Sequence, residues 1–440
     1  MRTIHEVLWE QFGQLTIEDI PSDVIQIAEQ CILDCIACAV AGSQEPLSEI
    51  LRDELAGQTG DASIIGSDLR APATIAALIN GAASHALDFD DTSIAMGGHA
   101  SVPVLPAVLA TAEAYGATGA EVLAAFVVGV EVESRLGSII GGKHYNAGWH
   151  VTSSIGVLGA AAAVSRLLKL NTEQFGRALG LAASQSSGLK ANFGTMTKPF
   201  HAGHAAERGL LSARLALRGF TANPESFAGK QGLVEAAAQG GEHLDRFEGL
   251  TGQWLTRQML FKYHAACYLT HSAIENVLNL KKLVIPAQTK ALNVTVHPSL
   301  LDVCGIPRPS TGLEAKFSIT ATTAMTMLDF DTTDTATFDD SLFQNDNLQS
   351  LIEKVNVETD GKLRSTQSKI VIESESGEAH DAFYDTGIPA TDIEAQGSKL
   401  RAKFGGLVRP ILGDSADQLA DNIYQLKNAD GVENLFAKAS

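Results

Sequence analysis

Hydrophobic positions in roughly the first 280 residues recur with the spacing of α-helices. Apolar side chains lie three to four residues apart or run continuously through Ala, Leu and Val, and glycines separate the segments. A period near 3.6 residues predicts helices. The predicted helices span residues 20–43, 72–89, 100–115, 119–140, 151–168, 202–217 and 265–278.

The pattern changes after residue 286 and changes back near Asp392. Strand-like alternation predicts strands at 290–298, 354–360, 368–374 and 378–385, the last two joined by a Ser-Gly turn. One helix is predicted among them, at 312–328, and helices return at 394–412 and 415–426. We therefore predict a mainly α protein with an α+β part. A large all-helical domain comprises residues 1–267 and 400–440, and a smaller α+β lid domain, residues 268–399, is inserted into it.

Composition narrows the class of protein. A chain of 440 residues with 45% hydrophobic content is long enough for two domains with a sizeable core. Its formal net charge of -19 argues against nucleic acid or an anionic membrane as a partner. No signal peptide or transmembrane span is predicted, and the five cysteines do not form a disulfide framework. These features favour a cytoplasmic protein.

Basic residues stand ahead of four helices that are rich in small side chains. His99, His150, Lys198 with His201, and Lys262 with His264 occupy these positions. Because a helix N-terminus has unpaired N–H groups and a positive partial charge, a neighbouring cation strengthens anion binding. The pattern predicts a pocket for a small anionic substrate.

The segment HALDFDDT crowds acidic and basic groups at the end of a predicted helix. Asp88 is interpreted as the carboxylate that orients one of the catalytic histidines, whereas His85 is interpreted as a satisfied core histidine. Asp90 and Asp91 can also be explained as residues that end the helix or hold neighbouring loops. The segment therefore predicts proton-transfer chemistry beside the anion site.

Several motifs together resemble the MmgE/PrpD family. They are HALDFDDT followed by a Gly-Gly-His turn, GWHVTSSIG, KANFGTMTKPFHAGHAA, FKYHAACYLTHS and EAKFS, in that order along the chain. The resemblance implies an enzyme that acts on small di-, tri- or tetracarboxylates without a metal or organic cofactor. It also implies a cleft between a helical domain and an α+β lid, and a homodimer.

Site residues follow from the resemblance and from the basic positions. The resemblance implies that the cleft is lined by Asp88, Thr92, His99, His150, Lys198 and Lys262. We expect the catalytic groups to be His99, His150, Lys198, Lys262 and Asp88. We expect substrate contacts from Thr92, Tyr145, Lys190, His201 and His264. No cofactor-binding or metal-binding residues are predicted.

One departure from the family pattern bears on the reaction. The decarboxylases of the family carry an active-site tyrosine in the helix after EAKFS-like residues, where this chain reads Phe317 to Ala321. Its loss favours an epimerase similar to iminodisuccinate epimerase, which needs proton transfer but no leaving group. The alternative is a lyase similar to 2-methylcitrate dehydratase or cis-aconitate decarboxylase.

Two hypotheses outside the family remain. The DFDD run is typical of Mg²⁺-dependent enzymes that bind diphosphates, although aromatic residues make up only 6% of the chain. The second hypothesis is a non-catalytic helical binding protein. This hypothesis predicts that the basic residues are dispersed and do not gather at one site.

Overall fold

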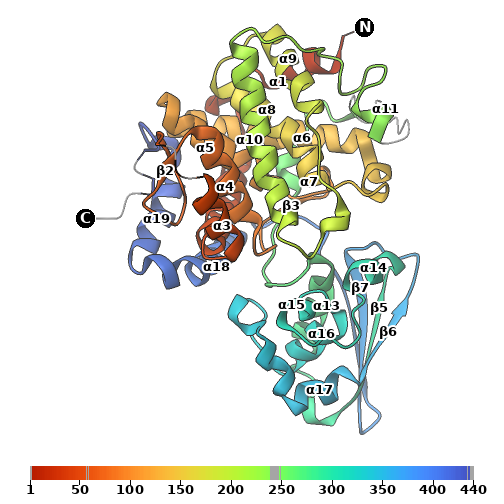
Figure 1. The fold of residues 1–440 in the computed structure, drawn as a ribbon. Coiled ribbons are helices and arrows are strands. Elements are labelled where there is room, and N and C mark those ends of the chain that lie inside the picture. The colour runs from red at the N-terminus through yellow and green to blue at the C-terminus, as the bar shows by residue number, and fades with distance from the viewer. Residues whose placement is uncertain are drawn as a thin grey trace. The chain divides into compact units, whose positions relative to one another are not determined.

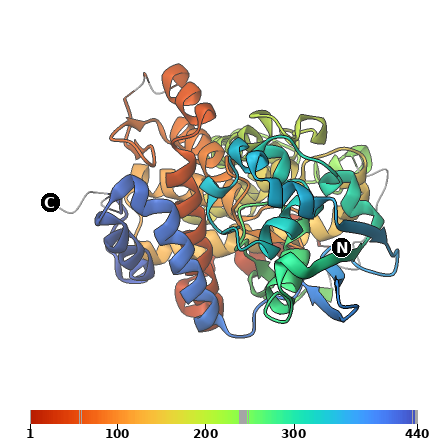
Figure 2. The same cartoon turned by 90° about the horizontal axis from the view of Figure 1, so that it is seen from below.

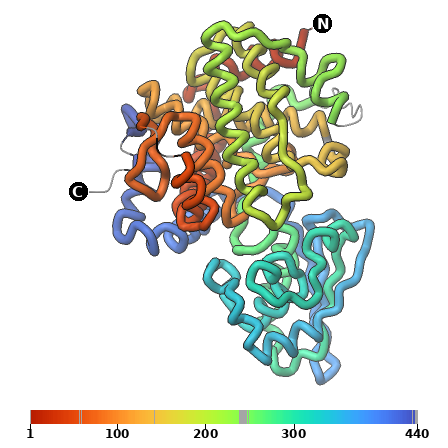
Figure 3. The backbone as a smooth tube through the Cα atoms, viewed as in Figure 1, coloured from red at the N-terminus to blue at the C-terminus, as the bar shows by residue number. Residues whose placement is uncertain are grey.

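The computed structural model of the chain is mainly helical, with one small mixed sheet and two short strand pairs (Figure 1). It describes residues 2–55, 57, 59–237, 247, 249–433 and 435–436. The chain divides into two compact units. Unit 1 comprises residues 1–261 and 390–440, and unit 2 comprises residues 262–389. Figure 3 follows the backbone out of unit 1 after Phe261 and back into it at Ala390.

Unit 1 is a bundle of helices, and some of them begin at side-chain caps. Thr3, Thr118 and Asn171 each accept a hydrogen bond from the third residue of the helix that follows, and that residue's side chain reaches back to the cap. The helices are α1 (Ile4–Phe12), α2 (Ser22–Gly42), α3 (Pro46–Leu55), α4 (Ala73–His85), α5 (Ser101–Tyr115), α6 (Gly119–Asn146), α7 (Val151–Ser154), α8 (Gly156–Leu167), α9 (Thr172–Ala183), α10 (Thr197–Leu217), α11 (Leu233–Ala237), α18 (Ile393–Leu412) and α19 (Ser415–Tyr424).

Small residues let the central helices of unit 1 approach closely. Helix α10 packs against α4 and α8, and alanines from α4, α5, α8 and α10 share one buried cluster. At the closest point Gly81 faces Gly203, and a Cβ on Gly203 would lie 2.1 Å from the carbonyl oxygen of Leu78. The Ala- and Gly-rich sequence is therefore a requirement of backbone proximity in the core.

Helix α2 is apolar along most of its length and lies in the core. By length and composition alone it is long enough to cross a membrane, but 83% of its most apolar window is buried inside the protein. It packs against α4 and against α18 from the C-terminal part of the chain, which runs beside it (Figure 2). This is the environment of a core helix in a folded domain.

Unit 2 contains a four-stranded sheet in the order β6-β5-β7-β8. The strands are β5 (Thr289–Val296), β6 (Val355–Thr359), β7 (Gln367–Ser374) and β8 (Ala379–Asp385). Only β5 and β6 are parallel, and a turn with Gly377 at φ +86 closes the β7–β8 hairpin. The helices are α13 (Tyr268–Leu280), α14 (Pro298–Cys304), α15 (Gly312–Ala315), α16 (Ile319–Met327) and α17 (Asp346–Ile352). Helices α13 and α16 pack on each other and on the sheet.

Several details differ from the sequence-based expectation. The unit boundaries lie at 261/262 and 389/390, where 267/268 and 399/400 were expected. A boundary at 399/400 would cut α18, which is one continuous helix packed on α2. Unit 1 also contains the short pairs β1 (Ala62–Ser63) with β2 (Arg70–Ala71), and β3 (Thr92–Ser93) with β4 (Met259–Leu260), so it is not all-helical.

Some predicted helices are also divided or displaced. The 151–168 helix is interrupted at Ile155, and the 312–328 helix at residues 316–318, where the side chain of Ser318 caps α16. Helices α14 and α17 were not anticipated. Helix α10 begins at Thr197, so Lys198 and His201 lie inside its first turns, whereas α13 begins only at Tyr268, several residues after Lys262 and His264.

The close approach of α4 and α10 generates a stability prediction. Gly203→Ala places a methyl group against backbone that cannot move independently, and we expect it to lower the free energy of unfolding by about 1–3 kcal/mol. The matched control is Gly406→Ala in α18, where no atom lies within 4 Å of the new Cβ. There the helix preference of Ala should raise stability by about 0.5–1 kcal/mol. Equal denaturation midpoints for both variants would contradict the packing argument.

Candidate active site

A sharp turn after α4 carries the acidic residues of the site. The helix ends at His85, and Asp88 adopts the left-handed conformation with φ +51, which non-glycine residues rarely adopt. The strand β3 then pairs with β4, and the Thr92 hydroxyl donates to the carbonyl oxygen of Gly98 at 3.1 Å. Thr92 therefore closes the loop that leads to His99. A strained residue between two anchored elements is a frequent feature of functional sites.

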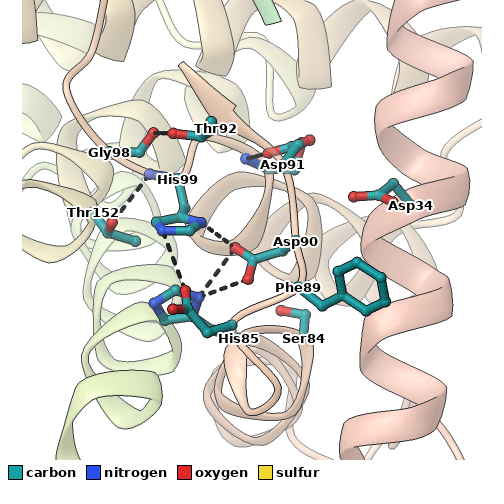
Figure 4. A network of polar contacts seen from close by, with 12 residues as sticks. Asp34, Ser84, His85, Phe89, Asp90, Asp91, Thr92, Gly98, His99 and Thr152 are labelled. Atoms are coloured by element: carbon teal, nitrogen blue, oxygen red, sulfur yellow. Dashed lines mark hydrogen bonds and ion pairs between the residues drawn. The ribbon is translucent and has the colours of Figure 1, made fainter. Parts of the chain in front are cut away.

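A carboxylate shared by two imidazoles forms the centre of the site (Figure 4). Nδ1 of His85 lies 2.9 and 3.1 Å from the two oxygens of Asp90. Nδ1 of His99 lies 2.8 Å from Oδ2 of the same carboxylate. The second nitrogen of His99, Nε2, lies 3.5 Å from Oδ1 of Asp88. Asp90 is thus the nearer of the two carboxylates to His99, and Asp88, the predicted orienter of one of the two catalytic histidines, faces its other nitrogen.

Burial and charge set the protonation states of this trio. Burial lowers the pKa of His85 to about 4, even though Asp90 opposes that shift, so the imidazole is neutral at pH 7. Burial alone would raise the pKa of Asp90, but the facing imidazoles His85 and His99 hold it well below its usual value. Asp90 is therefore a buried carboxylate that accepts from ring N–H groups.

Lys198 brings a positive charge to the same cluster. It lies in the first turn of α10, and its Nζ is 2.7 Å from Oδ1 of Asp88. Nζ also lies 5.3 Å from the centre of the Phe193 ring. The ammonium group is mostly but not fully buried. Such a cation can bind a carboxylate and stabilise negative charge that develops on it.

A second imidazole pair lies beside the first. His150 is the N-cap residue of α7, and its backbone N–H donates to the carbonyl oxygen of Gly188. Its Nδ1 is 3.1 Å from Nδ1 of His201 in α10. The ring centres of His150 and His85 are 5.8 Å apart. Burial, and then the neighbouring His85 and Lys198, lower the pKa of His150 well below its usual value, so its imidazole is neutral at pH 7.

Beneath the loop lies a buried acidic layer. Asp91 accepts from the backbone N–H and the hydroxyl of Ser101 at the start of α5. Burial and the nearby Asp34 carboxylate raise the pKa of Asp91 to about 8. Burial likewise raises the pKa of Glu133 in α6. The ammonium group of Lys403 from α18 lies 2.6 Å from Oδ1 of Asp34 and is the cation of this layer.

The structure brings most of the predicted residues of unit 1 together. Asp88, His99, His150, Lys198 and His201 form one connected cluster, which argues against the non-catalytic hypothesis of dispersed basic residues. Lys190 and Tyr145 pair with each other instead: Nζ lies 3.5 Å from the ring centre of Tyr145 and donates to its carbonyl oxygen.

Lys262 and His264 belong to unit 2. Lys262 is its first residue, and the Nδ1 atom of His264 lies 2.8 Å from the hydroxyl of Thr332 while its Nε2 lies 3.3 Å from Glu275. Their place in the catalytic and substrate-binding sets stays a prediction.

Sequence reasoning gave His85 and Asp90 minor roles, and the structure makes them the centre of the site. It also missed Lys403, which lies more than 300 residues away along the chain. Its Nζ donates to the carbonyl oxygen of Phe89 at 2.6 Å, between Asp88 and Asp90. An available signal was the run H-x-x-x-x-D, because a histidine at a helix end can turn back to a carboxylate five residues later. No local signal identifies Lys403.

The cluster contains a set of atoms with the composition of a metal site. One donor atom each from His85, Asp88, Asp90 and His99 lies within 4.8 Å of the others. Imidazole and carboxylate are ligands for Zn²⁺ and related ions. However, the carboxylate of Asp90 contacts Nδ1 of both His85 and His99, and Nζ of Lys198 contacts the carboxylate of Asp88. The possible metal-binding atoms are therefore engaged with other side chains. This arrangement fits acid–base chemistry better than a DFDD site for Mg²⁺.

Fold and cluster together define a helical protein with a buried acid–base site. Two family models match the chain: the MmgE/PrpD N-terminal domain over residues 9–244 and the MmgE/PrpD C-terminal domain over residues 264–427. The chain belongs to the MmgE/PrpD family, a family that includes enzymes.

Similar curated proteins include decarboxylases. The chain is 32% identical over 285 residues to the cis-aconitate decarboxylase of Aspergillus terreus, which is 61% of this chain and 58% of that protein. It is 34% identical over 235 residues to the human cis-aconitate decarboxylase, covering 51% of this chain and 48% of the relative. The chain is also 32% identical over 287 residues to the cis-aconitate decarboxylase-like protein oryM of Aspergillus oryzae. This match covers 61% of this chain and 60% of that protein. The chain thus spans less than two thirds of the length of these relatives.

The contact between Lys198 and Asp88 generates the first prediction for the site. If Lys198 binds a substrate carboxylate as predicted, Lys198→Met should reduce kcat/KM by a factor equivalent to about 2–4 kcal/mol, the scale for loss of a cationic donor. Thermal stability should change little, since the ammonium group keeps some contact with solvent. The exposed Lys290→Met serves as the control, and equal kinetics of the two variants would contradict the assignment.

Asp91 generates a prediction about pH. Between about pH 4, the ordinary pKa of aspartate, and about pH 8, the unfolded chain ionises Asp91 while the folded protein keeps it protonated. The free energy of unfolding therefore falls as pH rises through this window. Asp91→Asn removes the titration, so its stability relative to wild type should rise with pH, by at most about 1.4 kcal/mol per pH unit. Urea unfolding at pH 5, 6, 7 and 8 measures the difference, with the exposed Asp53→Asn as control. A pH-independent difference for Asp91→Asn would overturn the argument.

Proposed function

We propose that the protein is an enzyme that needs no cofactor and transfers a proton at a carbon beside a carboxylate of a small polycarboxylate. We further propose that the overall reaction is that of a lyase, which releases CO₂ or water. The similarity to cis-aconitate decarboxylases supports the lyase. The observation that carries the proton transfer is the cluster itself: neutral imidazoles, an ionised buried carboxylate and a lysine within one connected network.

The chemistry follows from the groups present. Negative charge must grow on a substrate that is already anionic, which makes proton removal from its carbon difficult. The ammonium group of Lys198 stabilises that charge. His99 presents Nε2 as a base or acid, since Asp90 holds its other nitrogen, and His150 is a second neutral imidazole. A dehydratase uses such groups to remove a proton and assist hydroxide departure, and a decarboxylase uses one to deliver a proton as CO₂ leaves.

An epimerase is the second candidate, on a specific observation. The stretch Phe317 to Ala321 at the start of α16 has no phenol that could assist a leaving group. His99 and His150 come from different elements, so one can remove the proton while the other returns it. This is the reaction expected of an iminodisuccinate epimerase-like member.

Incubation with a panel of small polycarboxylates in deuterium oxide, followed by NMR, separates the candidates. A lyase yields CO₂ or a dehydrated alkene from its substrate. An epimerase yields deuterium incorporation and the second stereoisomer with no loss of carbon or water. Activity retained in a chelator would exclude the Mg²⁺-dependent hypothesis, and inert behaviour toward every acid would contradict the proposal.

The general bases can be tested directly. His99→Gln and His150→Gln should each lower kcat by at least about 100-fold, a typical contribution of general acid–base catalysis, with smaller changes in KM. In an epimerase with one base per face, one variant should still exchange the proton of one stereoisomer without interconverting the two. Unchanged kcat in both variants would show that neither histidine takes part.

The cellular setting and assembly are proposals from the sequence. We propose a cytoplasmic homodimer, which fractionation and light scattering would test. A monomer in solution would overturn the second part.

A further inference from the structure

We propose that His85 is a positioning residue: it holds the Asp90 carboxylate so that His99 keeps its proton on Nδ1 and presents a bare Nε2 to the substrate. The catalytic consequence rests on the function proposed above. The positioning itself depends only on the contacts among these three side chains.

The distances define the proton on His85. Nδ1 lies within 3.1 Å of both oxygens of Asp90, and a ring nitrogen that faces a carboxylate so closely must carry the hydrogen. Nε2 is then the deprotonated nitrogen, and it is buried without a hydrogen-bond partner in the described part of the chain. His85 therefore acts toward Asp90 as a neutral N–H donor.

Burial separates His85 from the substrate. Its side chain is 0% exposed, whereas that of His99 is 14% exposed. Its ring centre lies 4.5 Å from that of His99 and 5.8 Å from that of His150, and the charged groups that act on it are Asp90 and Lys198. Since His85 has no route to the solvent, its effect on the reaction must pass through Asp90.

The contact of His99 with Asp90 explains why a second donor is needed. Nδ1 of His99 is 2.8 Å from Oδ2, so this contact holds one oxygen and leaves the carboxylate free to turn about it. The hydrogen bond from His85 reaches both oxygens and sets the carboxylate plane. Without it, Asp90 can rotate and His99 can move its proton to Nε2, toward Oδ1 of Asp88 at 3.5 Å. The wrong tautomer cannot accept a proton from the substrate.

Two nearly isosteric substitutions isolate the hydrogen bond. His85→Asn keeps an N–H donor near the position of Nδ1, whereas His85→Leu has a similar shape and no donor. If the proposal is right, kcat of His85→Leu falls about 10- to 100-fold below that of His85→Asn, with KM within about threefold; this is the scale known for loss of a partner that orients a metal-bound histidine. Equal kcat in the two variants would overturn it, because a purely structural role affects both alike.

A measurement without substrate separates this proposal from the proposed function. In ¹⁵N-histidine-labelled protein, the shifts of Nδ1 and Nε2 report the tautomer of each ring, and His99→Gln identifies the signals of His99. We expect His99 to carry its proton on Nδ1 in wild type and in His85→Asn, and to change toward Nε2 in His85→Leu. If His85→Leu does not fold, the wild-type spectrum still decides, since a proton on Nε2 of His99 or of His85 overturns the proposal. Should no polycarboxylate react, the tautomers alone still decide whether His85 positions Asp90 and His99 in this way.

Discussion

A buried carboxylate needs donors, and the site of this protein is arranged around the donors of Asp90. Removing a carboxylate from water is unfavourable unless hydrogen bonds replace its solvation. Here the replacements are the imidazole of His85 from the end of α4 and that of His99 from the approach to α5. The loop between those helices must therefore return on itself within fourteen residues. The positive φ of Asp88 and the short β3–β4 pair are how it does so.

Keeping that loop in place depends on distant parts of unit 1. Lys403 of α18 has its side chain only 6% exposed, and its ammonium group holds both Asp34 of α2 and the carbonyl oxygen of Phe89. The C-terminal return of the chain thus contributes a cation directly under the acidic loop. Glycine contacts between α4 and α10 bring His85 and Lys198 toward the same place, since each residue lies near the end of its helix. Core packing and site geometry are consequently linked through the same two helices.

The sequence predicted the helical class, the strands and most of the cluster because those depend on local signals. The period of apolar residues, the cationic positions near helix starts and the crowded HALDFDDT run are all visible along a single stretch of chain. The features that the sequence did not predict depend on tertiary contacts. Asp90 and Asp88 are equivalent as local candidates, and only the backbone at Asp88 directs Asp90 toward two imidazoles and Asp88 toward Lys198. The division of helices at Ile155 and at residues 316–318 likewise depends on packing and on a side-chain cap that periodicity does not report.

The same acid–base groups are compatible with more than one reaction of the family, and the reason is chemical. Loss of CO₂, loss of water and epimerisation all involve proton transfer at a carbon beside a carboxylate, and all benefit from a cation near that carboxylate. The roles proposed for Asp88, Asp90, His99, His150 and Lys198 cover these functions and specify no leaving group. Discrimination therefore depends on what surrounds the departing atom. The stretch 317–321 of unit 2 contains no tyrosine and so offers no phenol that could assist departure. The relatives favour a lyase, and in a dehydration a neutral imidazole such as that of His150 could protonate the leaving hydroxide only after it had accepted the substrate proton.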